Sequence, residues 1–156
     1  MYRRVEGELQ VLLVHPGGPF WANRDAGAWS IPKGEYEPDE PPEQAALREF
    51  GEETGVAVAG KLSPLGEAVQ PSRKTVTAYA LEGDVDITAI RSNSFEIEWP
   101  PRSGRLQSFP EVDRAEWFTL SDARGKIIAG QLPFLEQLEA LHLPTVQSTD
   151  TTQKEG

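Results

Sequence analysis

The chain has 156 residues, a length that suits one domain with a single hydrophobic core. It contains no cysteine, which excludes disulfides, thiolate zinc sites and cysteine nucleophiles, and its longest apolar run, residues 11–14, is far too short to span a membrane. The net charge of −10 disfavours a nucleic acid polymer as partner. We therefore predict a cytoplasmic protein that binds neither nucleic acid polymers nor membranes.

Residue patterns near the start of the chain predict strands and loops. Residues 9–14 are rich in Val and Leu and predict a strand, and residues 2–5 are expected to pair with it through a turn at residues 6–8. The Pro and Gly content of residues 15–19 predicts a loop. Residues 29–31 predict a short strand that Pro32 ends.

A helix is predicted over residues 42–54. Prolines at positions 41 and 42 are tolerated in a first helical turn, and either Asp39 or Glu40 is expected to cap the free N–H groups. Gly55 is the expected C-terminal stop.

The rest of the chain mixes both kinds of element. Strands are predicted at residues 65–69, 74–81, 95–99 and 115–118, and helices at residues 121–129, opened by a Ser121 cap, and 133–143. The polar tail at residues 145–156 is predicted to be disordered, which leaves one domain at residues 1–144. The order of elements predicts an α+β fold or an α/β/α sandwich.

Acidic residues concentrate in one stretch. Residues 35–53 hold eight acidic residues and one arginine. Glu49, Glu52 and Glu53 stand at i, i+3 and i+4, so a helix would crowd three carboxylates on one face near its C-terminus, where the helix dipole disfavours anions. Such oxygen-rich clusters suit Mg²⁺ or Mn²⁺. Arg48 can reach Glu52 one turn on and Glu40 at the helix start, and so hold the acidic patch in shape.

The segment from Gly34 to Val56 resembles the Nudix box. Phe50 and Val56 fill its two apolar positions, and every fixed position of the box is matched, by Gly34, Glu40, Arg48, Glu49, Glu52, Glu53 and Gly55. The resemblance implies a Nudix fold, with a mixed β-sheet between helices. It also implies a hydrolase that cleaves a diphosphate linkage in a nucleoside diphosphate joined to another group.

The resemblance also implies roles for single residues. Glu49 and Glu53 would be the main ligands of Mg²⁺ (or Mn²⁺), with Glu52 and the Gly34 carbonyl adding to the site. Arg48 and Glu40 would orient these ligands. The general base would be Glu52, Glu49 or a carboxylate outside the box. Glu111 is the candidate outside the box, and its alternative interpretation as a solvated loop acid stays open.

Residues outside the box bear on the substrate. Lys33 and Trp29 lie in a Trp-x-x-Pro-Lys-Gly segment that looks like that of Nudix enzymes acting on diadenosine polyphosphates and diphosphoinositol phosphates. Pro71 instead matches the position of a proline in ADP-ribose members. Arg73 is a candidate for binding further phosphates, with a place flanking a strand as its alternative. Trp21 and Trp99 are candidates for stacking on a base, and for each of them a place in the core is an equal alternative.

A dinucleoside polyphosphate or a nucleoside triphosphate is the preferred substrate. ADP-ribose or another nucleotide sugar is the alternative. A non-catalytic nucleotide-sensing module ranks lower, because the box is complete. The expected assembly is a monomer or a homodimer, and residues 95–105 are candidates for either a specificity insert or a dimer contact.

Overall fold

The computed structural model describes residues 1–34, 38–69 and 73–142. Its central sheet has three antiparallel strands in the order β1 (Tyr2–Val5), β2 (Glu8–Pro16) and β7 (Val112–Thr119). Glu6 and Gly7 connect β1 to β2, and both have positive φ angles, of 52° and 82°. Two such residues match the right-handed twist of the strands, so the predicted pairing through this turn is confirmed.

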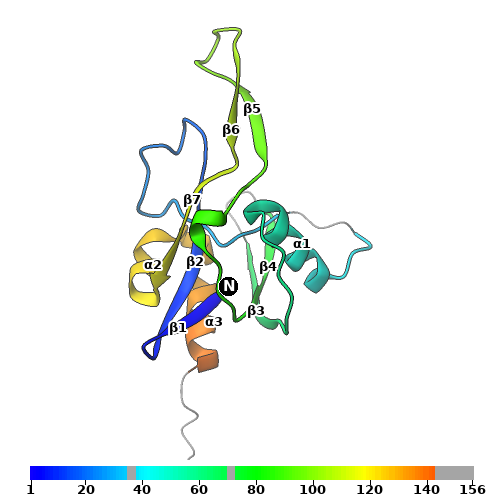
Figure 1. The fold of residues 1–156 in the computed structure, drawn as a ribbon, viewed down its shortest axis with the longest axis vertical. Coiled ribbons are helices and arrows are strands. Elements are labelled where there is room, and N and C mark those ends of the chain that lie inside the picture. Colours follow the sequence, from blue (N-terminus) through cyan, green and yellow to red (C-terminus); the bar gives the residue numbers. More distant parts are fainter. Residues whose placement is uncertain (35–37, 70–72, 143–156) are drawn as a thin grey trace, which may run out of the picture.

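Two hairpins complete the strand content. β3 (Ser63–Val69) pairs with β4 (Thr75–Ala80), and a parallel bridge between Tyr2 and Glu82 ties the chain after β4 to β1. β5 (Ser94–Glu98) pairs with β6 (Leu106–Pro110) in a hairpin that stands away from the body of the molecule (Figure 1). β6 was not predicted from the sequence.

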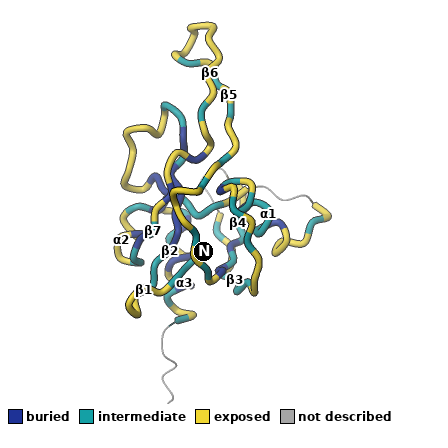
Figure 2. The backbone as a smooth tube through the Cα atoms, viewed as in Figure 1, coloured by how far each residue is buried: buried dark blue, intermediate teal, exposed yellow. Residues whose placement is uncertain are grey.

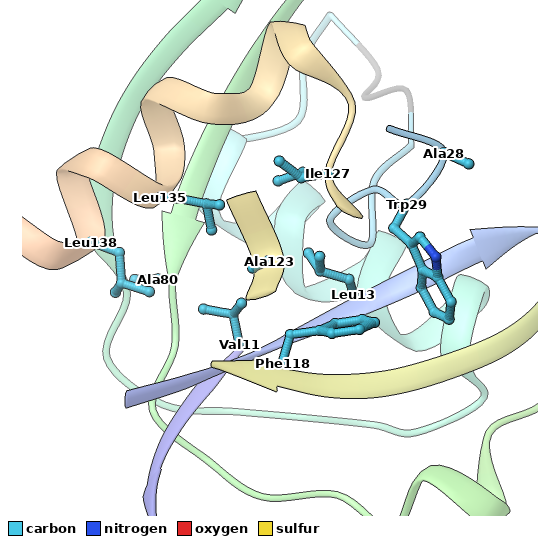
Figure 3. Packing of buried hydrophobic residues seen from close by; sticks show 10 residues of the cluster. All are labelled: Val11, Leu13, Ala28, Trp29, Ala80, Phe118, Ala123, Ile127, Leu135 and Leu138. Atoms are coloured by element: carbon cyan, nitrogen blue, oxygen red, sulfur yellow. The ribbon is translucent and has the colours of Figure 1, made fainter. Parts of the chain in front are cut away.

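The helices lie on both faces of β2. Its odd-numbered residues Val11 and Leu13 belong to a core cluster with residues of α2 (Leu120–Lys126) and α3 (Leu132–His142), shown in Figure 3. Its even-numbered residues Leu12 and Val14 pack in a second cluster with Phe50 of α1 (Pro42–Thr54). The buried backbone accordingly runs through the middle of the molecule (Figure 2). The predicted α+β fold with helices on both sides of the sheet is confirmed.

Helix α1 has the predicted bounds, but its N-terminal cap differs. Pro41 is the N-cap residue and no side chain caps the helix, so the prediction of a cap by Asp39 or Glu40 was wrong. Glu40 bonds Arg48 instead. Gly55 ends the helix as predicted, with φ of 74° and its N–H donated to the Gly51 carbonyl.

Other boundaries also differ from the prediction. β2 continues through His15 and Pro16, which were predicted as loop. Trp29 and Ser30 form only isolated bridges, to Ile127 and Val14. Thr119, rather than Ser121, caps α2 by accepting from the Asp122 N–H. Short 3₁₀ helices occur at η1 (Ile87–Ala89) and η2 (Ala129–Gln131). The tail at 145–156 lies outside the described residues, and within those residues no helix is long and apolar enough to cross a membrane.

Candidate active site

The segment that leads into the box is held by a residue from the far end of the chain. Ser30 exchanges backbone hydrogen bonds with Val14 of β2. The fully buried side chain of Gln131 accepts from the Ile31 N–H at 3.0 Å and donates to Ser30 Oγ at 3.1 Å. Because Ser30 and Ile31 are anchored in this way directly before Pro32, the chain reaches Lys33 and Gly34 in a defined position beside α1.

Two carboxylates of α1 meet the backbone at Lys33 and Gly34. The Lys33 N–H donates to Glu53 Oε2 at 2.5 Å. The Glu49 carboxylate lies against Gly34 so closely that a Cβ at position 34 would overlap it. A side chain at position 34 would therefore displace the carboxylate end of Glu49 from its observed position.

The environment of these two carboxylates opposes their negative charge. Burial raises the pKa of Glu53 to about 7, and the charges of Glu111 and Glu49 add to the increase, while the hydrogen bond and charge of Lys33 oppose it. Burial also raises the pKa of Glu49, against the attraction of Arg48. Glu111 thus acts on Glu53 through space, although it lies far along the chain between β6 and β7.

Arg48 organises the other acids of the box. Its guanidinium donates to Glu40 at 2.8 and 3.0 Å and to both oxygens of Glu52 at 3.1 Å, and it lies 3.1 Å from Glu49. These bonds raise the pKa of Arg48 above its usual range, chiefly through Glu40 and then Glu52. The predicted Arg–Glu arrangement is confirmed as geometry.

The arrangement sets Glu49 and Glu53 apart from Glu52. Glu49 and Glu53 face residues 33 and 34, whereas Glu52 turns to Arg48 and is half exposed. Among the described residues, no group of three or more acidic or histidine side chains is close enough to hold a metal ion as the side chains stand. Glu49 and Glu53 nevertheless supply hard oxygen donors in surroundings where burial disfavours their negative charge, and such donors suit Mg²⁺ or Mn²⁺.

A cavity of about 590 Å³ opens beside these groups. Lys33, Gly34 and Glu49 line it on the side of the site, and Lys74 of the β3–β4 hairpin lines it as well. Its other walls are mainly apolar and come from α1, β4 and α3, among them Phe50, Tyr79, Phe134, Leu135 and Leu138. A charged edge and an apolar interior suit a ligand with an anionic part and a flat, less polar part.

Not every predicted substrate-binding residue lies at this cavity. Trp29 is 1% exposed and packs in the core against Phe118 and His15, so its assignment to substrate binding was wrong. Trp99, which lies between β5 and β6, contacts Phe20 and does not line the cavity. Arg73 is exposed and does not line the cavity either. Trp21 is an exposed loop residue rather than core. Pro71 lies outside the described residues.

Two residues at the site, Gln131 and Tyr79, come from distant parts of the chain and were not predicted from the sequence. Gln131 gives no signal of its own, because a glutamine after a helix is most often a surface residue. Tyr79 was assigned only to a strand. The partial alternation of residues 74–81 could have indicated that one face of this strand is buried and lines an apolar cavity.

Comparisons with known proteins identify the family and similar folds. The sequence matches the family model of the NUDIX domain over residues 2–138. The fold is similar to the NUDIX domain of Shewanella oneidensis NrtR complexed with ADP ribose, with a TM-score of 0.57, 22% identity and coverage of 90% of this chain and 82% of that chain. It is also similar to a C. elegans Ap4A hydrolase binary complex, with a TM-score of 0.57, 22% identity and coverage of 90% of each chain.

A third similar structure is the MutT protein from Methanosarcina mazei Go1, with a TM-score of 0.53, 23% identity and coverage of 92% of this chain and 91% of that chain. A comparison with curated proteins gave no match. At these identities the structural neighbours show the fold alone, whereas the family model covers most of the sequence, including the whole box. The chain therefore belongs to the NUDIX domain family.

Proposed function

We propose that this protein is a Mg²⁺-dependent pyrophosphohydrolase that cleaves a diphosphate linkage in a nucleoside diphosphate derivative. The observation that carries the proposal is the meeting of the Glu49 and Glu53 carboxylates with the backbone of Lys33 and Gly34, at the edge of a largely apolar cavity. Anionic phosphates and negative carboxylates repel each other, so a cation between them is needed for binding.

Glu49 and Glu53 would hold the metal ion, with the Gly34 carbonyl and Glu52 as further oxygen donors. Mn²⁺ is an acceptable substitute for Mg²⁺ with these donors. When bound, the ion would neutralise charge on the diphosphate and make a bound water more acidic. Arg48 would act as a positioning residue, because its hydrogen bonds to Glu40 and Glu52 fix the side chains beside the metal ligands on α1.

Lys33 and Glu111 are proposed to act on the substrate and the water. The Lys33 ammonium would contact a phosphate oxygen, as its place on the cavity wall permits. Glu111 would take a proton from the attacking water. Glu52 and Glu49 are the alternatives for this role, but Arg48 already holds Glu52 with two hydrogen bonds and lies beside Glu49, which favours Glu111.

The cavity is proposed to take the nucleoside. Two lysines on its lining, Lys33 and Lys74, favour a substrate with several phosphates, so a dinucleoside polyphosphate or a nucleoside triphosphate is preferred. The alternative is ADP-ribose or a nucleotide sugar, since the similar NrtR domain is complexed with ADP ribose. A cytoplasmic location, where such nucleotides occur, is part of the proposal.

The test is product release from a panel of nucleotides in the presence of Mg²⁺, Mn²⁺ or EDTA. The panel contains a diadenosine tetraphosphate, nucleoside triphosphates, ADP-ribose and a diphosphoinositol phosphate. We expect metal-dependent turnover of a polyphosphate substrate, and loss of that turnover in Glu53→Gln.

The panel separates the candidate functions. Preferred turnover of ADP-ribose would replace the substrate assignment but keep the hydrolase. Tight ADP-ribose binding without turnover of any compound would overturn the enzyme proposal in favour of a nucleotide-sensing module.

A further inference from the structure

Strand β7, which begins where the β5–β6 hairpin ends (Figure 1), carries an extra residue near its start. Its pairing with β2 is regular up to the pair His15 and Arg114. The next pair is Pro16 and Val112, so Asp113 is the extra residue of a β-bulge and has no partner in β2. Such bulges redirect the neighbouring side chains and are common next to active sites.

The bulge decides which face of the sheet the start of β7 meets. Val112 and Ala115 both pack in the cluster that contains Phe50 of α1. Residues three apart in a regular strand point to opposite faces, so the bulge is what lets both side chains reach α1. Glu111, whose negative charge acts on Glu53, is bonded directly to Val112. The position of Glu111 therefore depends on the bulge.

The backbone of Glu111 is held from two sides. Its N–H donates to the Asn93 carbonyl at 2.8 Å, and its own carbonyl accepts from the Gly17 N–H at 2.9 Å. Gly17 is buried, and a Cβ there would lie 1.9 Å from the Pro110 carbonyl oxygen. The loop after β2 therefore packs directly on the segment that carries Glu111, and the two must keep their relative position.

His15 joins the bulge to that loop. Its side chain is fully buried, with Nδ1 2.8 Å from Asp113 Oδ1 and Nε2 2.6 Å from the Arg24 carbonyl oxygen. The ring also packs edge-on against Trp29, with centroids 5.1 Å apart. A buried polar ring is costly unless its nitrogens keep their partners, so His15 fixes both the bulge and the end of the loop. Neither His15 nor Asp113 lines the cavity.

We propose, on the basis of the proposed role of Glu111 as the general base, that His15 and Asp113 are positioning residues for it. Their contact holds the bulge, and the bulge keeps the Glu111 carboxylate within reach of Glu53 and of the attacking water. Because a displacement of about 1 Å can cost a catalytic group much of its effect, a pair that touches no substrate can still control the rate.

The kinetic test uses the substrate found in the nucleotide panel, with Mg²⁺. Asp113→Ala removes the oxygen that His15 contacts, and it should lower kcat about tenfold or more with KM unchanged within about twofold, because the cavity is untouched. Asp113→Asn keeps an oxygen acceptor in the same place and should stay within about threefold of the wild-type kcat. The matched control is Glu116→Ala, which removes an exposed acid from the same strand and should retain the wild-type kcat.

A double-mutant cycle identifies the residue through which Asp113 acts. In a Glu111→Gln protein, Asp113→Ala should lower kcat by no more than about a further twofold, because the group that it positions is already lost. A full loss in both backgrounds would mean that Asp113 acts on some other group, and this would overturn the proposal. A wild-type kcat for Asp113→Ala would overturn it as well.

Amide hydrogen exchange, measured by NMR without substrate or metal, tests the placement itself. The amides of Glu111 and Gly17 should exchange about tenfold or more faster in Asp113→Ala than in the wild type. The Leu12 amide, which is hydrogen-bonded away from the bulge, should change by less than about twofold, so a local release is distinguished from general destabilisation. Unchanged exchange at Glu111 and Gly17 would overturn the proposal whatever the activity. A wild-type kcat in Glu111→Gln would refute the general base, and with it the catalytic part of the proposal, whereas faster exchange would still support the placement.

Discussion

Glu53 shows at the scale of one residue how position decides chemistry. Its carboxylate accepts a hydrogen bond from the Lys33 N–H, and the negative charges of Glu111 and Glu49 add to the increase in its pKa. Replacing Glu53 with Gln keeps the shape and removes the charge. We expect kcat to fall by at least about 100-fold, since metal-centred charge stabilisation contributes several kcal/mol. Glu43→Gln, an exposed acid in the first turn of the same helix, should retain wild-type kcat. A Glu53→Gln protein with wild-type turnover would contradict the assignment of Glu53 as a ligand.

Gly34 affects the site differently, because a side chain there would take up the space that the Glu49 carboxylate occupies. A Cβ at this position would overlap the Glu49 carboxylate. Gly34→Ala should therefore displace Glu49 and lower kcat/KM by about tenfold or more, because small misplacements of catalytic groups reduce rates strongly. The control is Gly125→Ala, where an added Cβ meets no atom within 4 Å. Equal activity of the two variants would show that Glu49 does not need its observed position.

Asp25 gives a pH-dependent contribution to stability. Hydrogen bonds from Lys126 and from Trp29 Nε1 hold the pKa of Asp25 below its usual value of 3.8. A lowered pKa in the folded state means that the unfolded chain binds the proton more readily. The stabilisation is therefore present at neutral pH and is lost as the pH falls below the usual pKa. Asp25→Asn should lower Tm at pH 7, and the difference from the wild type should shrink as the pH falls below the usual pKa of 3.8, measured by thermal denaturation. A difference that stays constant with pH would exclude this ionic origin; Asp39→Asn, at an exposed position, serves as control.

At the scale of elements, distant parts of the chain fix the segment before α1. Gln131, next to the start of α3, holds Ile31 and Ser30 through two hydrogen bonds in a buried place. Gln131→Leu should reduce the free energy of unfolding by ~1–3 kcal/mol, because the Ile31 N–H loses its partner away from water. It should also raise KM, since the position of Lys33 depends on this anchor. Denaturant unfolding and steady-state kinetics together check both parts.

A matched control for this anchor is Gln137→Leu, at an exposed position of α3. Its unfolding free energy should stay within ~0.5 kcal/mol of the wild type, as for most surface substitutions. A loss of stability in Gln131→Leu with unchanged KM would mean that residue 131 supports the fold but does not position Lys33.

At the scale of the whole molecule, the site and the fold are linked through charge. Several carboxylates of α1 lie close together and repel one another. The packing of Phe50 against the sheet offsets this unfavourable energy. A cation that binds only the folded state relieves this repulsion and stabilises by about 2.7 kcal/mol at 100 times its dissociation constant. We expect millimolar Mg²⁺ to raise Tm by about 2–4 °C for each kcal/mol gained, and EDTA to reverse the rise.

The metal effect has its own control in the same assay. Glu53→Gln should show a much smaller rise in Tm with Mg²⁺, while Glu43→Gln should respond as the wild type does. An equal rise in all proteins would point to general screening of the net charge of −10, not to a site.

The sequence by itself determined whatever depends on local spacing. The bounds of α1, its Gly55 stop, the β1–β2 turn and the contacts of Arg48 with Glu40 and Glu52 follow from helical periodicity and from residues with special backbone preferences. The family could also be predicted from local spacing, because every position of the box lies within residues 34–56.

Only the tertiary structure decided which distant residues meet. It buried Trp29 against Phe118, although the surrounding segment favoured a role in substrate binding. It brought Gln131 to the segment before the box and placed Glu111 within electrostatic reach of Glu53. The physical reason is that such contacts join residues far apart in the chain, where packing of the whole core, rather than local spacing, selects the neighbours.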